Sequence, residues 1–210
     1  MANDVDAELL RAWRGGNAEA GNELVRRNFM SVYRFFVNKA SEDVDDLIQR
    51  TFLACVESRD KFRGESSFRT YIFGVAHNVL GKHFRSKRRH GDRIDFGVTS
   101  VHDLSPSPSV VVAKHREQRL LLEALRRIPL EHQVVLELYY WERLPAPEVA
   151  NIVGCPEGTA RTRIRRAKQL LVEEMEKLEV NKEQLNSTIV NLEGWAEGLR
   201  EQLLDDSEPK

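Results

Sequence analysis

The chain has 210 residues, of which 41% are hydrophobic and 31% are charged, proportions typical of a folded globular protein rather than a disordered one. It contains no uninterrupted apolar run of about 18 residues, the length that a membrane-spanning helix needs. Its N-terminal residues are acidic and lack the apolar core of a signal peptide. We therefore expect a cytoplasmic protein that neither spans nor associates with a membrane.

Charge is distributed unevenly along the chain. The net charge is −1 overall, but residues 173–210 hold 11 acidic and 4 basic side chains, a net charge of −7 that leaves +6 on residues 1–172. A basic body with an acidic tail indicates an anionic partner for the body. Cys55 and Cys155 lie in apolar helical patterns and are expected to be free thiols. Because no histidine has ligand spacing with either cysteine, we expect no metal and no cofactor.

Helical periodicity dominates the first 90 residues. Asn17 is placed to cap one helix, and Ser41, followed by two acidic residues, is placed to cap another. Helices are expected at residues 6–14, 17–39, 41–57 and 67–89. The second of them is expected to bury an apolar stripe of Leu24, Phe29, Val32, Tyr33 and Phe36. Because no alternating strand pattern occurs, residues 1–90 predict a small all-α domain.

A change of composition at Gly91 marks a linker. Residues 91–110 include Pro106 and Pro108 within a Ser-Pro-Ser-Pro-Ser run, which disfavours helix before each proline. An extended linker of this length is unusual inside one compact domain, so it predicts two domains. Helical periodicity resumes near Val111 and gives a second small all-α domain over residues 111–176.

The second domain contains the pattern of a helix-turn-helix. A helix over residues 131–141 is followed by a short helix over 148–153, a Gly154-Cys155-Pro156 turn and a third helix over 160–171. The third helix is expected to bury Ala160, Ile164, Ala167 and Leu171. Arginine and threonine side chains crowd its other face and suit guanine edges and phosphates in the major groove. The candidate DNA-binding residues are Thr159, Arg161, Thr162, Arg165 and Arg166.

Residues 149–167, VANIVGCPEGTARTRIRRA, resemble the second conserved domain of the short, two-domain sigma factors of bacterial RNA polymerase, the extracytoplasmic-function (ECF) kind. The resemblance implies that this helix binds the minus-thirty-five promoter element. The family usually has valine where Ala160 stands and serine at Thr162, and both changes are conservative.

The first domain shows the same resemblance independently. Residues 43–52, DVDDLIQRTF, resemble the sigma segment that docks on the clamp helices of core RNA polymerase, with Arg50 replacing an acid common in the family. The resemblance implies polymerase-binding roles for Asp43, Asp46, Leu47, Gln49 and Phe52.

Residues 62–73, FRGESSFRTYIF, and residues 78–89 resemble the part that opens and reads the minus-ten element. Such a role requires aromatic surfaces, polar groups for an unstacked base and cations for phosphates. Tyr71 stands where the family often has tryptophan and therefore offers a smaller stacking surface. The implied minus-ten residues are Phe62, Arg63, Tyr71, Asn78, Lys82, Arg85, Arg88 and Arg89.

Residues 177–210 form an acidic extension beyond the resemblance. Apolar residues recur there every seven positions, which predicts a heptad-patterned helix. The seam consists of Leu171, Leu178, Leu185, Leu192 and Leu199, each followed four residues later by Met175, Lys182, Ile189, Ala196 and Leu203. The helix is expected either to form a coiled coil with a second copy or a regulator such as an anti-sigma factor, or to fold back on its own basic body.

The combined pattern predicts a sigma factor that brings core RNA polymerase to promoter DNA and performs no catalysis of its own. The alternatives are a conventional DNA-binding regulator that uses only the helix-turn-helix, and a coiled-coil adaptor or anti-sigma-like protein. An enzyme is disfavoured because no phosphate loop, nucleophile–base set or ligand cluster occurs in the sequence.

Overall fold

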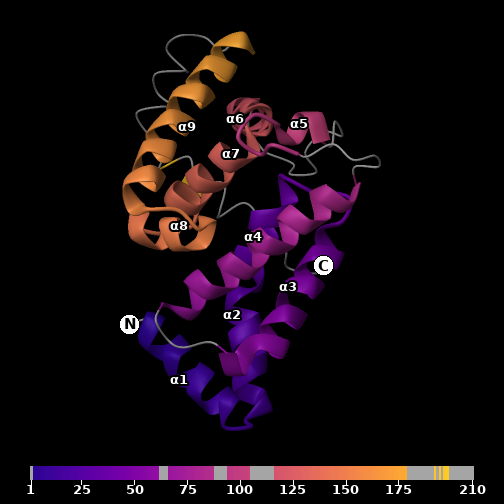
Figure 1. The fold of residues 1–210 in the computed structure, drawn as a ribbon, viewed down its shortest axis with the longest axis vertical. Coiled ribbons are helices and arrows are strands. Elements are labelled where there is room, and N and C mark those ends of the chain that lie inside the picture. The colour runs from indigo at the N-terminus through magenta and orange to yellow at the C-terminus, as the bar shows by residue number, and fades with distance from the viewer. Residues whose placement is uncertain are drawn as a thin grey trace.

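The computed structural model describes residues 2–61, 66–87, 94–104, 116–178, 192, 194 and 196–198. Within these ranges the chain is built from helices, with no strand and one isolated antiparallel bridge between Ser100 and Pro129 (Figure 1). This confirms the all-α class. None of the helices described has both the length and the hydropathy that crossing a bilayer requires.

The N-terminal half is a bundle of four long helices. They are α1 (Ala2–Arg14), α2 (Ala18–Val37), α3 (Val44–Ser58) and α4 (Phe68–Lys87), with the single 3-10 turn η1 (Arg59–Lys61) after α3. Asn17 caps α2 as expected, because its side-chain oxygen accepts hydrogen bonds from the backbone N–H groups of Glu19 and Ala20 at 3.0 and 3.2 Å. The expected cap at Ser41 is wrong: α3 begins at Val44, with Asp43 at the N-cap position.

The linker is more ordered than its composition predicts. Residues 94–104, its described part, form a turn and the short helix α5 (Val101–Leu104). The Asp103 carboxylate accepts hydrogen bonds from the backbone N–H and hydroxyl of Ser100, and the Ser100 hydroxyl accepts one from the backbone N–H of Asp103. This reciprocal cap starts α5. The two prolines of the linker lie outside the described residues.

The C-terminal half holds the helix-turn-helix. Its helices are α6 (Arg116–Arg127), α7 (Leu130–Leu136), the π-helix η2 (Glu137–Trp141), α8 (Ala146–Val153) and α9 (Glu157–Lys177). The expected helix over 131–141 is therefore two elements, because its second half widens from α to π geometry. The third expected helix begins three residues earlier, at Glu157, directly after Pro156.

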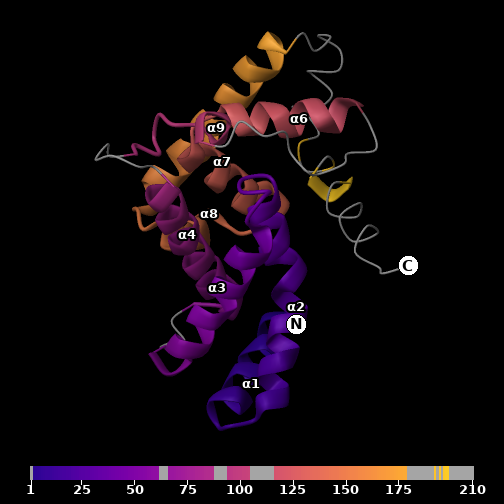
Figure 2. The ribbon, with the colours of Figure 1, turned by 90° about the vertical axis from the view of Figure 1, so that its right-hand side faces the viewer.

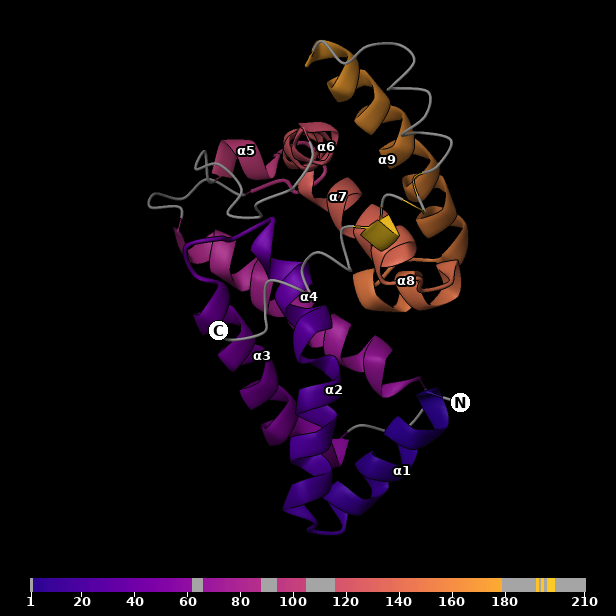
Figure 3. The same cartoon turned by 180° about the vertical axis from the view of Figure 1, so that it is seen from behind.

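The two halves pack against each other. Figure 1 shows α8 next to α4, and side chains of both halves belong to one continuous apolar core. The view turned by 90° shows the same arrangement, with α6 and α9 above the N-terminal bundle (Figure 2). Seen from behind, α2 and α4 lie together below α7, and α8 lies beside α4 (Figure 3).

Candidate nucleic-acid and polymerase interface

The helix-turn-helix has one buried and one open face. Gly154 ends α8 in the left-handed conformation, at φ 68° and ψ 41°, which a residue with a side chain rarely adopts. The turn places α9 so that Ala160, Ile164, Ala167 and Leu171 are buried, as expected. The five candidate DNA-binding residues are all exposed: Thr159, Arg161, Thr162, Arg165 and Arg166.

Two of the exposed cations on α9 take part in ion pairs. Arg161 lies 2.6 Å from a carboxylate oxygen of Glu157, one helical turn earlier, and Arg166 lies 3.2 Å from one of Glu173. Arg165 makes no ion pair with the part of the chain that the structure describes. Such exposed pairs contribute about 0–1 kcal/mol. They therefore yield easily when a phosphate or a guanine competes for the arginine.

The candidate minus-ten residues that the structure describes lie on α4. Asn78, Lys82 and Arg85 are exposed at positions i, i+4 and i+7, which share one helix face. Tyr71 is half-buried and its hydroxyl lies 2.5 Å from the hydroxyl of Ser58, while burial raises the pKa of its phenol. Four expected residues lie outside the described ranges: Phe62, Arg63, Arg88 and Arg89.

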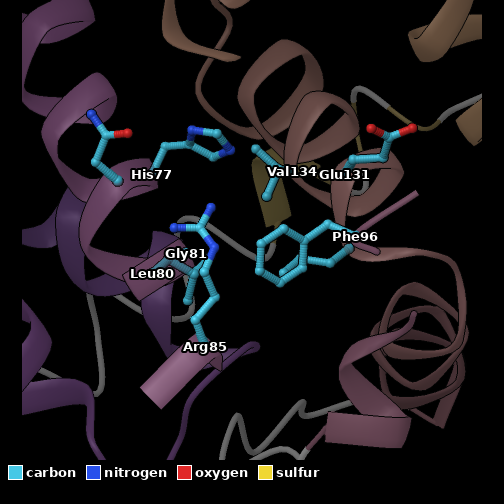
Figure 4. Close-up of a pocket in the computed structure, with 9 residues that line it drawn as sticks. His77, Leu80, Gly81, Arg85, Phe96, Glu131 and Val134 are labelled. Carbon is cyan, nitrogen blue, oxygen red and sulfur yellow. The ribbon is translucent and has the colours of Figure 1, made fainter. Parts of the chain in front are cut away.

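A pocket adjoins this face of α4. The Arg85 guanidinium lies 5.5 Å from the ring centroid of Phe96 in the linker, and Figure 4 shows the two side chains approaching each other beside His77. The pocket is lined by His77, Asn78, Leu80, Gly81, Arg85, Phe96, Leu130, Glu131 and Val134. Two minus-ten candidates, Asn78 and Arg85, therefore line a pocket shared with the linker and α7, and Arg85 contacts Phe96 of the linker.

The expected polymerase-binding residues share α3 and its N-cap but differ in exposure. Asp46 and Gln49 are exposed and Phe52 is half-buried, whereas Leu47 is fully buried and belongs to the bundle core. Asp43 pairs with Lys87 of α4, whose hydrogen bond is the main cause that lowers the pKa of the Asp43 carboxyl. Leu47 therefore packs inside the bundle rather than on its surface.

Sequence reasoning missed an apolar patch beside these residues. Leu53 is 54% exposed, Val56 43% and Phe29 42%, and the Phe29 ring stacks on Phe52 with centroids 6.4 Å apart. Phe29 was expected in the inner stripe of α2, so that expectation is wrong. The signal in the sequence was that α3 has more apolar residues than one core-facing stripe can hold.

Comparisons with known proteins agree for both halves of the chain. Residues 23–90 match the family model of Sigma-70 region 2, and residues 118–171 match that of Sigma-70, region 4. The ECF RNA polymerase sigma-E factor of Haemophilus influenzae is 26% identical over 185 residues, which cover 83% of this chain and 97% of the relative. The RNA polymerase sigma factor HrpL of Pseudomonas syringae is 29% identical over 168 residues, which cover 78% and 91%.

A solved structure supports the same fold. The sigma factor RpoE of Bartonella quintana, solved in complex with the anti-sigma factor NepR, superposes with a TM-score of 0.55 at 17% identity, over 74% of this chain and 96% of that one. A conventional helix-turn-helix regulator or a coiled-coil adaptor does not account for a region 2 match joined to a region 4 match. The chain therefore belongs to the ECF sigma factors, non-enzymatic subunits that direct RNA polymerase to initiate transcription at specific promoters.

Proposed function

We propose that α9 reads the minus-thirty-five element, that α4 contacts the minus-ten element and that α3 docks on core RNA polymerase. The observation that carries this proposal is the two-sided character of α9, whose apolar face is buried while Thr159, Arg161 and Arg165 stand exposed. Residues 1–90 then act as the region 2 domain, 91–110 as the linker, 111–176 as the region 4 domain and 177–210 as an extension. The partners imply action in the cytoplasm.

Transcription with purified core polymerase and a promoter library tests these roles. Arg165→Ala is expected to relax preference at one base pair of the upstream element by about 1–3 kcal/mol. Arg26→Ala removes another exposed arginine, from α2, and serves as the control, with unchanged preference. A variant Arg165→Ala that keeps the wild-type preference at every position would contradict the assignment of α9.

We also propose that the C-terminal extension folds back on the region 4 domain. Leu192 and Ala196 are buried in the core of their own chain, and Gly198 faces the side chain of Gln118 on α6. Four seam positions are thereby occupied within one molecule: Leu171, Met175, Leu192 and Ala196. The seam positions 182, 185, 189, 199 and 203 lie outside the described residues, so the coiled coil stays a prediction for them.

Sedimentation equilibrium distinguishes the two arrangements. A monomer at micromolar concentration is expected for the folded-back extension, whereas a dimer that is lost on truncation after Glu179 would favour the coiled coil. An anti-sigma factor remains a proposed partner, supported by the complex of the Bartonella quintana protein with NepR. Pull-down of an anti-sigma factor with the full-length chain and with the chain truncated after Glu179 would show whether the extension competes with the anti-sigma factor.

A further inference from the structure

The first turn of α9 holds an acidic side chain beside basic ones. Glu157 begins the helix, and Arg161 and Arg165 follow it at intervals of four residues, which places the three on one helix face. All three are exposed. The candidate DNA-binding residues lie on this face, so a carboxylate stands where the helix is expected to meet a polyanion. An unpaired carboxylate in that place would be repelled by the phosphates.

Glu157 holds the Arg161 guanidinium by one edge. Nε of Arg161 donates a hydrogen bond to Oε1 of Glu157 at 2.8 Å, and Nη2 lies 2.6 Å from the same oxygen. The guanidinium is planar and its N–H donors are fixed in a fork, so two contacts along this edge orient the whole group. The Arg161 side chain is 64% exposed, which leaves the rest of the group open to a partner outside the chain.

The second edge of the guanidinium is the one that matches a guanine. Nη1 and the outer N–H of Nη2 form this end-on edge, and two parallel N–H donors pair with O6 and N7 of guanine in the major groove. Within the described part of the chain, Nη1 of Arg161 makes no hydrogen bond or ion pair. A phosphate can compete with Glu157 for Arg161, but a guanine can bind the arginine while Glu157 stays in place.

The second carboxylate oxygen of Glu157 adds an acceptor to this donor edge. Both Arg161 contacts go to Oε1, and Oε2 accepts no hydrogen bond from the residues that the structure describes. The hydrogen-bond donors on base edges in the major groove are exocyclic amino groups, and a carboxylate suits N4 of cytosine. In a G·C pair that amino group lies next to O6 of guanine. The ion pair therefore offers donors and an acceptor that are complementary to a G·C pair.

Arg165 provides an internal comparison. It is the same residue type on the same face of α9, one turn further along, but none of the described carboxylates pairs with it. The residue four positions before it is Arg161, a second cation. An effect that acts through the Glu157 carboxylate should therefore appear at the base that Arg161 reads and be absent at the base that Arg165 reads.

We propose that Glu157 is a specificity-determining residue, which presents Arg161 end-on to a guanine of the upstream element and accepts a hydrogen bond from the cytosine amino group beside it. The inference rests on the reading of the minus-thirty-five element by α9 proposed above. The two side chains enter the groove as one neutral unit, because separation would leave the carboxylate unpaired beside phosphates. Glu157 thus lowers the attraction to DNA in general while it raises the discrimination between bases.

Competition binding of the complete holoenzyme to promoters that carry every base at each upstream position tests this role. Glu157→Gln removes the charge and keeps the size of the side chain. It is expected to lower the preference for guanine at one position at least about fivefold, because the guanidinium loses its fixed orientation. Binding to DNA without a promoter is expected to tighten, and the slope of log affinity against log salt to steepen by up to about 1, because one carboxylate fewer opposes the phosphates.

Matched variants make the result specific. Glu174→Gln removes the same charge from the C-terminal part of α9, where Glu174 pairs with Lys177 at 2.6 Å, and it should leave the preference at every position unchanged. Arg161→Ala should abolish the same guanine preference, and adding Glu157→Gln to it should change little more, because the two residues act as one unit. Adding Glu157→Gln to Arg165→Ala should instead give the product of the two separate effects.

Two results would overturn the proposal. One is a Glu157→Gln variant that keeps the wild-type preference at every position. The other is an equal weakening at all positions together with a lower melting temperature, which would reduce Glu157 to a stabiliser of the helix N-terminus. A loss of preference in Arg161→Ala without one in Glu157→Gln removes the role of Glu157 alone. Wild-type preference in both Arg161→Ala and Arg165→Ala would also remove the reading role of α9.

Discussion

Nη2 of Arg143 lies 2.7 Å from Oε1 of Glu197, an ion pair that joins the loop before α8 to the C-terminal extension. Arg143 directly follows Glu142, and its backbone has a φ of 53°, a left-handed conformation that is uncommon for a residue other than glycine. The extension therefore contacts the chain next to Glu142, whose carboxylate pairs with Arg34 on α2 and Arg69 on α4. Both side chains of the pair are more than half exposed, so the buried Leu192 and Ala196 must supply most of the attachment.

Substitution in the extension tests this division of roles. Leu192→Asp is expected to lower the free energy of unfolding of the region 4 half by at least about 1.5–3 kcal/mol, because it removes a buried leucine side chain and places a carboxylate in the apolar site. Glu197→Gln is expected to cost only about 0–1 kcal/mol, as exposed ion pairs do. Urea denaturation followed by circular dichroism measures both, and equal costs for the two variants would contradict the burial of Leu192.

The crossing of α1 and α2 depends on Gly21. A Cβ atom at this position would lie 2.5 Å from Nε1 of Trp13, closer than any real contact. Gly21→Ala should therefore destabilise the bundle by about 1–3 kcal/mol through overpacking. Gly74→Ala is the matched control in α4, where nothing lies within 4 Å of the new atom, and it should stabilise the fold by about 0.5–1 kcal/mol. A thermal melt of both variants checks the opposite signs.

The exposed apolar patch on α2 and α3 should carry part of the affinity for core polymerase. Leu53→Ser is expected to weaken binding by about 2 kcal/mol, roughly thirtyfold, while the melting temperature stays almost constant because the side chain is exposed. Val5→Ser changes a comparably exposed residue on α1 and serves as the control. Fluorescence anisotropy with labelled sigma factor measures both, and unchanged affinity for Leu53→Ser would remove the patch from the docking surface.

Lys82 on α4 is expected to contact phosphate rather than a base. Lys82→Ala should weaken holoenzyme binding about equally on all promoters and reduce the slope of log affinity against log salt by about 1, because one fewer counterion is released. Titrations between low and moderate salt give the slope directly. A change confined to one promoter sequence would instead indicate base recognition.

Acidification should destabilise the fold through three histidines. Burial is the largest cause that lowers the pKa of His77, His83 and His132 below 6.5. The unfolded chain therefore binds more protons than the folded chain between these lowered values and 6.5. The stability that depends on the neutral imidazoles is complete above pH 6.5 and is lost as the pH falls through the window below it.

Melting temperatures between pH 7.5 and 5 test this sign. The carboxyls of Asp43 and Asp103 do not interfere, because their pKa values are lowered from 3.8 by hydrogen bonds from Lys87 and Ser100. His83→Gln is expected to flatten part of the dependence. A melting temperature that rises on acidification would contradict the burial of these imidazoles in neutral form.

Local signals predicted the helices and the turn of the helix-turn-helix. Asn17, Gly154 and the buried stripe from Ala160 to Leu171 act through neighbours within a few residues, so their roles could be predicted from spacing alone. The family resemblance then supplied the promoter and polymerase roles.

Contacts between distant segments could not be predicted in this way. Lys39 and Glu137 are 98 residues apart, and nothing near either residue indicates the other. The linker was expected to be extended because its composition is rich in serine and proline, but the Ser100–Asp103 cap and the contact with α7 order residues 94–104. The exposure of Phe29 likewise depends on where α3 lies, which helical periodicity within α2 does not specify.

The π turn between Glu137 and Trp141 sets the orientation of the residues that follow it, without itself containing a candidate DNA-binding residue. Removing one residue there would restore α-helical winding and rotate everything after it by about 100° around the helix axis. Glu142 would then leave Arg34 and Arg69, although every candidate DNA-binding side chain would be unchanged in identity. A single-codon deletion in this short stretch is therefore expected to change how the two halves pack while every candidate DNA-binding residue stays the same.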